Sequence, residues 1–95
     1  MAPSIVAAIP RHPYVVRVVF ADGEVRDVDI EPVLDGPVFE PLRDPDAFGA
    51  VYVDEETRTI AWPNGADLDP DVLYDPSLES ASGRGPRITV LSPVS

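Results

Sequence analysis

The chain has 95 residues, the size of one small domain, and a net charge of −10 at pH 7 that argues against direct DNA or RNA binding, because nucleic-acid binders present a basic face to the phosphates. It has no cysteine, which excludes disulfides and thiolate metal sites. Its longest N-terminal apolar run, Ile5 to Ile9, is far shorter than the ~20 residues that span a membrane, so we expect a cytoplasmic protein without membrane contact.

Small size and acidity together suggest that the chain works with a partner. A chain this short buries a smaller share of its surface than a larger domain does, so we expect a thin core that a homodimer or another protein completes. An acidic surface attracts basic proteins at long range, although it also serves simply to keep a small domain soluble.

An edge strand is expected near the N-terminus, where Ser4 to Ile9 forms an apolar run that ends at Pro10. Prolines at positions 3, 10 and 13 lack the N–H group that a central strand needs, which favours the edge of a sheet. We expect residues 11–13 to form a loop before the next strand.

The clearest local signal is a β-hairpin made of Tyr14–Phe20, the turn Ala21–Gly23, and Glu24–Ile30. A two-residue Asp-Gly loop would mix core and solvent residues on one face. A three-residue loop with Gly23 in the left-handed conformation separates them instead. Its pairs are 20 with 24, 18 with 26, 16 with 28 and 14 with 30.

In this register one face of the hairpin is apolar and the other is mixed. The apolar face carries Tyr14, Val16, Val18, Phe20, Val28 and Ile30. The mixed face places Arg17 opposite Asp27, Val19 opposite Val25, and Val15 opposite Asp29. The first of these pairs supports the register, since an opposite-charge cross-strand pair contributes up to ~1 kcal/mol. Because the mixed face is half apolar, we expect the C-terminal segment or a partner to cover part of it.

A proline-rich connection and a short helix follow the hairpin. Residues Glu31–Leu42 contain three prolines and a glycine, which predicts a loop or a bent short strand around Val38 and Phe39. Asp44-Pro45-Asp46 is typical of a helix start, because a capping carboxylate precedes a proline at the first helical position. Gly49 ends this helix.

A second hairpin is predicted from Val51–Val53 and Arg58–Trp62, and Trp62–Gly65 then forms a β-turn. Asp69-Pro70-Asp71 repeats the helix-start pattern.

These elements predict an α+β fold, a small antiparallel sheet of two hairpins with one or two short helices. We expect this single domain to occupy residues 1–78. Residues 79–95 form a linker-like tail, within which Arg87–Leu91 is a candidate for a terminal strand.

No catalytic or metal-binding pattern stands out. Asp67, Asp69 and Asp71 alternate as the first ligands of a calcium loop do, but the glycine and the bidentate glutamate of that loop are missing. Helix capping accounts for Asp69 and Asp71 without a metal. His12 has no Ser or Cys nucleophile pattern around it. We therefore expect neither an enzyme nor a cofactor.

Two aromatic residues, Trp62 and Tyr74, have two interpretations. As core residues they would close the second helical segment onto the sheet. As surface residues they would form an interaction site beside Asn64 and Asp67. The sequence leaves both interpretations open.

Several blocks together resemble a small bacterial family, domain-of-unknown-function family 2442. They are Val18-x-Phe20-Ala-Asp22-Gly23-Glu24, Val38-Phe39-x-x-Leu42-x-Asp44, Phe48, Trp62-Pro63-Asn64-Gly65-Ala66-Asp67-Leu68 and Leu73-Tyr74. The resemblance covers about the first three quarters of the chain. It implies a compact α+β domain, often encoded beside a second small protein in pairs suspected to be toxin–antitoxin modules. Some relatives continue into a helix-turn-helix domain, for which Ser77–Ser95 is too short.

We interpret the chain as a small acidic protein-interaction module, antitoxin-like or regulatory toward a neighbouring small protein that is basic and toxin-like. The expected partner-binding residues are Trp62, Asn64, Asp67 and Asp69. One alternative is a small-molecule-binding or minor enzymatic domain that uses carboxylates near the Trp-Pro-Asn-Gly turn. Another is a homo-oligomeric scaffold that associates through the face of Val15, Val19 and Val25.

Overall fold

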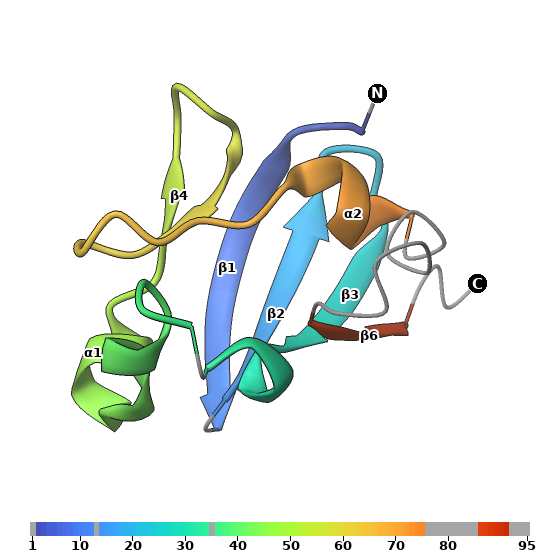
Figure 1. The fold of residues 1–95 in the computed structure, drawn as a ribbon. Coiled ribbons are helices and arrows are strands. Elements are labelled where there is room, and N and C mark those ends of the chain that lie inside the picture. The colour runs from blue at the N-terminus through green and yellow to red at the C-terminus, as the bar shows by residue number, and fades with distance from the viewer. Residues whose placement is uncertain (1, 13, 35, 76–85, 92–95) are drawn as a thin grey trace.

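A four-stranded antiparallel sheet with the strand order β1-β2-β3-β6 is the main element of the computed structural model (Figure 1). Its strands are β1 (Ile5–His12), β2 (Val15–Phe20), β3 (Val25–Asp29) and β6 (Arg87–Val90). A second sheet, formed by β4 (Tyr52–Asp54) and β5 (Thr59–Ala61), contacts β1. The structure describes residues 2–12, 14–34, 36–75 and 86–91.

Four short helices lie in the described ranges. They are the 3₁₀-helices η1 (Glu31–Val33) and η2 (Glu40–Arg43) and the α-helices α1 (Pro45–Gly49) and α2 (Pro70–Tyr74). The predicted α+β class is therefore confirmed, with the two hairpins in separate sheets.

The register of the β2–β3 hairpin is the predicted one. Val16 pairs with Val28, and Val18 pairs with Arg26. Gly23 has φ +93°, and the Phe20 N–H donates to the Glu24 carbonyl at 2.8 Å, as a three-residue turn requires. The Arg17 guanidinium donates two hydrogen bonds to the Asp27 carboxylate, at 2.8 and 3.0 Å. The predicted cross-strand ion pair is therefore confirmed.

The register also places a charged residue, Arg26, on the inner face, where it is 5% exposed. Its Nη1 donates to Glu24 Oε1 at 2.8 Å, and its Nη2 donates to the Tyr74 carbonyl at 3.1 Å. The guanidinium also lies over the rings of Phe20 and Tyr74, with centroid distances of 5.9 and 5.2 Å. A buried cation needs such an ion pair, hydrogen bonds and aromatic contacts to offset its lost hydration.

Helix α2 packs against the turn of this hairpin through Tyr74. The Tyr74 ring meets the Phe20 ring edge-to-face at a centroid distance of 5.0 Å, and its hydroxyl donates to the Asp22 carboxylate. This hydrogen bond lowers the pKa of Asp22 and raises the pKa of Tyr74, because it stabilises the ionised carboxylate and the protonated phenol. A side chain in the β2–β3 turn is thereby joined to the last residue of α2.

Strand β1 is an edge strand, as predicted, but it continues through Pro10 to His12 instead of ending in a loop at residues 11–13. The bonds Phe20 N–H to Glu24 O and Ile30 N–H to Tyr14 O show that even-numbered residues of β2 bond to β3. Pro10 lies opposite Val16, so its nitrogen faces away from β2. The missing N–H therefore costs no ladder hydrogen bond, which is why the strand tolerates the proline.

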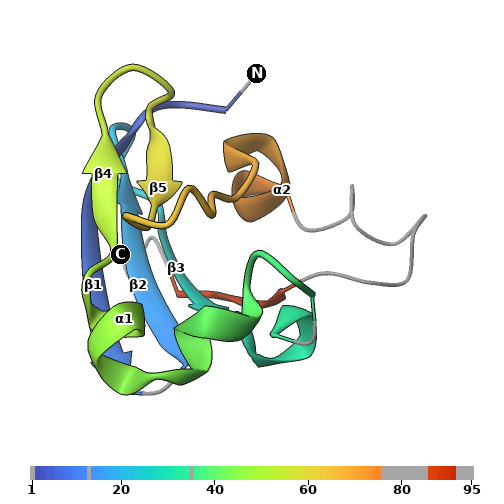
Figure 2. The ribbon, with the colours of Figure 1, turned by 60° about the vertical axis from the view of Figure 1, so that its left-hand side comes forward.

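The connection between β3 and α1 contains 3₁₀-helices where the sequence predicted a loop or a bent strand. Pro32 and Pro41 occupy the first turns of η1 and η2, positions where a missing N–H is harmless. Val38 and Phe39 lie in the turn between the two helices. Figure 2 shows this connection and α2 on the same side of the four-stranded sheet.

Both predicted helix starts are confirmed. Asp44 caps α1 by accepting from the Asp46 N–H at 3.1 Å, and Asp69 caps α2 by accepting from the Asp71 N–H at 2.9 Å. Each cap satisfies one of the free N–H groups at the helix N-terminus. The proline that follows each capping aspartate stands in the first helical turn.

A single core lies between the inner face of the large sheet, the small sheet and the helices. Its buried members are Ile5, Val16, Val18, Phe20, Val28, Ile30, Leu34, Leu42, Phe48, Ile60, Trp62, Ala66 and Leu73. The side chains of Val15, Val19 and Val25 are only half-buried and do not belong to this cluster.

Strand β6 pairs with β3, so the sheet includes residues beyond position 79. Its pairs include Ile88 with Val28, and Arg87 donates to Asp29 Oδ2 at 3.0 Å. Of the predicted linker-like tail, residues 79–85 and 92–95 lie outside the described part of the chain. No helix within the described ranges is long and apolar enough to cross a membrane.

Replacing Gly23 tests the turn that sets this register. An added Cβ would meet nothing within 4 Å at Gly23 or at Gly49, but only Gly23 has a left-handed φ. We expect Gly23→Ala to lower the free energy of unfolding by about 1–2 kcal/mol, since a side chain disfavours that backbone conformation. Gly49→Ala is the control, and should leave stability unchanged or raise it by up to about 1 kcal/mol. Equal effects in urea titrations would contradict this account.

The Tyr74–Asp22 hydrogen bond should make stability depend on pH at both extremes. The stabilisation of the folded state by Asp22 is lost as pH falls below the ordinary carboxyl pKa of 3.8. The stabilisation by Tyr74 is lost as pH rises above the ordinary phenol pKa of 10.0. We expect Tyr74→Phe to lower the thermal midpoint most between about pH 5 and 9, with the difference shrinking outside that window. Tyr14→Phe is the control at the acid extreme, because Tyr14 donates to the Arg43 backbone carbonyl, which does not titrate. A Tyr74→Phe difference that is constant down to about pH 2 would contradict this assignment.

Candidate functional site

The predicted turn at Trp62–Gly65 forms, and it borders a small surface pocket. The Gly65 N–H donates to the Trp62 carbonyl at 2.9 Å, which closes the turn, and the Trp62 N–H donates to the Ala66 carbonyl at 2.8 Å. Gly65 has φ +94°, a conformation that favours glycine. Asn64 Oδ1 accepts from the Ala66 N–H at 3.1 Å, so the asparagine side chain also holds the turn.

Trp62 belongs to the core, which settles the choice that the sequence left open. It is 1% exposed, and its indole Nε1–H donates to the Phe48 carbonyl at 2.9 Å. Phe39 and Phe48 pack around it, with ring-centroid distances of 6.3 and 6.1 Å. A buried indole whose N–H is satisfied is held rigidly. Trp62 is therefore not the exposed partner-binding residue that the surface interpretation required.

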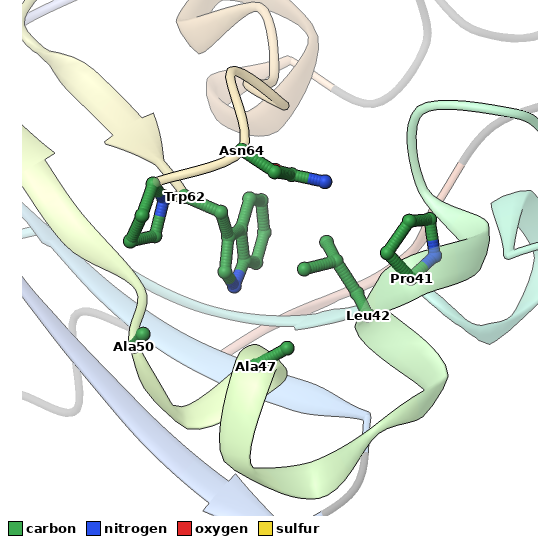
Figure 3. Close-up of a pocket in the computed structure, with 7 residues that line it drawn as sticks. Pro41, Leu42, Ala47, Ala50, Trp62 and Asn64 are labelled. Carbon is green, nitrogen blue, oxygen red and sulfur yellow. The ribbon is translucent and has the colours of Figure 1, made fainter.

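A small open pocket of about 140 Å³ lies beside Trp62 (Figure 3). It is lined by Pro41, Leu42, Ala47, Ala50, Trp62, Pro63 and Asn64. The lining comes from η2, from α1 and its C-cap, and from the Trp62 turn. Six of these seven residues are apolar, and Asn64 alone supplies a polar side chain. The pocket is thus suited to an apolar group.

Asn64 joins the turn to the connection that precedes η2. Its Nδ2 donates to the Val38 carbonyl at 3.0 Å, across 26 residues of sequence. Val38 itself is 49% exposed and is one of the larger exposed apolar side chains of the described chain. The Asn64 side chain is exposed and lies at the pocket in Figure 3.

Asp67 and Asp69, the other two predicted partner-binding residues, do not line this pocket. Asp67 is exposed and forms a single β-bridge with Ala61. Asp69 is also exposed, but its side chain caps α2. The structure therefore brings Trp62 and Asn64 together at one site and leaves the two aspartates outside its lining.

The acidic groups nearest in sequence to the pocket are on the elements that build it. Glu40 lies in η2, Asp44 caps α1, and Asp46 lies in its first turn; all three are exposed. Arg43, at the end of η2, is the basic residue of this stretch. The wall formed by residues 40–50 therefore combines an apolar lining with excess negative charge.

Sequence reasoning missed the small apolar residues of the site, Pro41, Leu42, Ala47 and Ala50. No catalytic or ligand-binding motif contains these residues, because they become neighbours only when η2, α1 and the turn pack together. Two features of the sequence did indicate the elements that form the pocket. The capping aspartate Asp44 predicted α1, and the turn at Asn64 was predicted directly.

No group of three or more His, Cys, Asp or Glu side chains in the described ranges is arranged to hold a metal ion. Asp69 and Asp71, which suggested a calcium loop by their spacing, serve other contacts. Asp69 caps α2, and Asp71 Oδ1 accepts from the Ala2 N–H at 2.7 Å. His12 is the last residue of β1, and its side chain lies outside what the structure describes.

Shortening the indole tests how rigidly Trp62 is held. Trp62→Phe removes the indole donor to the Phe48 carbonyl, which keeps the Val51 N–H at 3.3 Å, and also removes buried ring volume, so we expect the free energy of unfolding to fall by about 2–4 kcal/mol. Urea titrations followed by circular dichroism measure this loss. Tyr52→Phe is the control, because Tyr52 is 44% exposed and its change should be within about 0.5 kcal/mol. Equal effects for the two variants would show that Trp62 does not anchor the site.

Comparison with known proteins identifies the family. The chain matches the family model described as Protein of unknown function (DUF2442) over residues 5–79. The matched range contains every element from β1 to α2, including the Trp62 turn and the whole pocket lining. No curated protein and no solved structure matches the chain. The chain belongs to the DUF2442 family of proteins of unknown function.

Proposed function

We propose that the chain is a small protein-interaction module whose Trp62 pocket receives one apolar side chain of a basic partner protein. The observation that supports this proposal most strongly is an open apolar pocket bordered by elements that carry excess carboxylates. Buried hot spots at protein interfaces consist of such pockets, filled by one anchor side chain and surrounded by polar groups.

The size of the pocket favours a side chain over a free ligand. Sites for drug-sized molecules measure roughly 300–1,000 Å³. The pocket beside Trp62 has about 140 Å³, which is the scale of one aliphatic side chain. The seven lining residues include no carboxylate, so they do not provide the acid and base groups that the enzymatic alternative required.

Charge selects the class of partner. The chain carries 17 acidic residues against seven arginines, and Glu40, Asp44 and Asp46 stand on the pocket-forming elements. A basic protein would be attracted at long range and would then place its apolar anchor in the pocket. Because salt screens the attraction between exposed opposite charges, the complex should weaken as the salt concentration rises.

The resemblance of the Trp-Pro-Asn-Gly-Ala-Asp block suggests which partner to test first. It implies a second small protein encoded beside this one, toward which the chain would act as an antitoxin-like or regulatory subunit. That role would place the pocket at the contact between the two proteins.

Filling the pocket tests the proposal directly. Ala50 is exposed and lines the pocket, so a larger ring at this position should occupy it without disturbing the core. We expect tagged wild-type chain to co-purify a stoichiometric basic protein from its native host, and Ala50→Phe to bind it at least about tenfold more weakly. Mass spectrometry identifies the partner, and titration in about 0.1 M salt measures the affinity.

Ala21→Phe is the matched control, since Ala21 is also exposed but lies in the β2–β3 turn. It should bind the partner as the wild type does. Wild-type affinity in Ala50→Phe would exclude the pocket as the contact, and the absence of any co-purifying protein at physiological salt would contradict the interaction role itself.

A further inference from the structure

The outer face of the four-stranded sheet is a second surface, separate from the Trp62 pocket. The register places Ala7, Ile9, Val15, Arg17, Val19, Val25, Asp27, Asp29, Arg87 and Thr89 on it. Ile9 is 46% exposed, and the three valines are half-buried and outside the core cluster. The connection from β3 to α1 and helix α2 lie on the other side of the sheet (Figure 2).

This face differs from the rest of the molecule in its charge. Its described side chains include two arginines and two aspartates, which pair as Arg17 with Asp27 and Arg87 with Asp29. The described side chains of the face therefore have no net charge, whereas the chain as a whole has a net charge of −10. Two of the seven arginines are used to neutralise a single sheet face.

We propose that this outer sheet face, defined by the ten residues above, binds a second copy of the chain in a two-fold symmetric dimer. Two chains of charge −10 repel each other at long range, so they associate most easily through a surface on which charge is already balanced. A two-fold axis brings the same patch of each copy together.

The composition of the face suits such a pairing. Aliphatic side chains from β1, β2 and β3 would meet their counterparts as the facing layers of a β-sandwich do. Arg17 and Asp27 already pair within each copy, so two copies can meet across a two-fold axis without bringing an unpaired charge into the contact. A basic partner, by contrast, finds no net negative charge on this face and is attracted elsewhere.

The proposed dimer does not depend on the Trp62 pocket, and the effect of salt on binding distinguishes the two proposals. Association of like-charged chains should strengthen with salt, because screening removes their mutual repulsion, whereas a complex with a basic partner should weaken. Sedimentation equilibrium of the full chain should show a mass of twice 10.3 kDa. The dissociation constant of the dimer should decrease when the salt concentration is raised from about 0.05 M to about 0.3 M.

Substitutions at Ile9 locate the interface. Ile9→Glu and Ile9→Lys should each raise the dimer dissociation constant at least about tenfold, because both place a charge in the apolar contact. The lysine variant lowers the net negative charge of the chain. If both variants weaken the dimer, the cause cannot be increased repulsion between two negatively charged chains. Val38→Glu is the control, since Val38 is exposed to a similar extent, 49%, but lies in the η1–η2 connection. Circular dichroism confirms that each variant is folded.

Three results would overturn the proposal. One is a monomeric mass at both salt concentrations up to about 1 mM protein. Another is a dimer that Val38→Glu disrupts and the Ile9 variants do not. The third is a dimer that weakens as salt is raised, because its interface would then depend on opposite charges between copies.

Discussion

The conformation of Gly23 is the constraint on which the rest of the structure depends. Because Gly23 has the left-handed backbone conformation, the β2–β3 turn is three residues long. The length of the turn sets the register, and the register determines which side chains lie on the same face. A slip by one residue would place Val28 on the face opposite to Val16 and Val18, and would mix core and solvent residues on each face. The same register places Arg17 opposite Asp27 on the outside and Arg26 on the inside. Core, buried cation and neutral outer face thus have one geometric cause.

Arg26 shows how this small core accommodates a charge. Its guanidinium contacts Glu24, the Tyr74 carbonyl and two aromatic rings, so the hairpin and α2 are joined through it. Trp62 has a corresponding role at the other end of the core, where its N–H bond to Phe48 joins β5 and the turn after it to α1. Two amphipathic side chains therefore connect helices that are too short to be stable alone.

Sequence reasoning succeeded where the signal is local. The hairpin register, both aspartate caps, the Trp62 turn and the α+β class follow from residues within a few positions of each other. It failed where contacts between distant segments determine the structure. Strand β1 continues through Pro10 because the nitrogen of that residue faces away from β2. The pocket lining at Leu42, Ala47 and Ala50 forms only when η2, α1 and the Trp62 turn pack together. Arg26 was within reach, since pairing 18 with 26 already placed it beside Val18 on the apolar face.

Strand β6 has a practical consequence for the boundaries of the domain. The family match ends at residue 79, yet β6 occupies the edge of β3 at residues 87–90. A fragment cut at the family boundary would lose β6, in which Ile88 pairs with Val28. It would therefore expose the backbone donors and acceptors along that edge of β3. Such an edge is a template for intermolecular strand addition, so a truncated protein would be prone to aggregate. Expression of this domain for crystallisation or NMR should extend through Leu91, whose N–H bonds to the Val25 carbonyl at 3.0 Å.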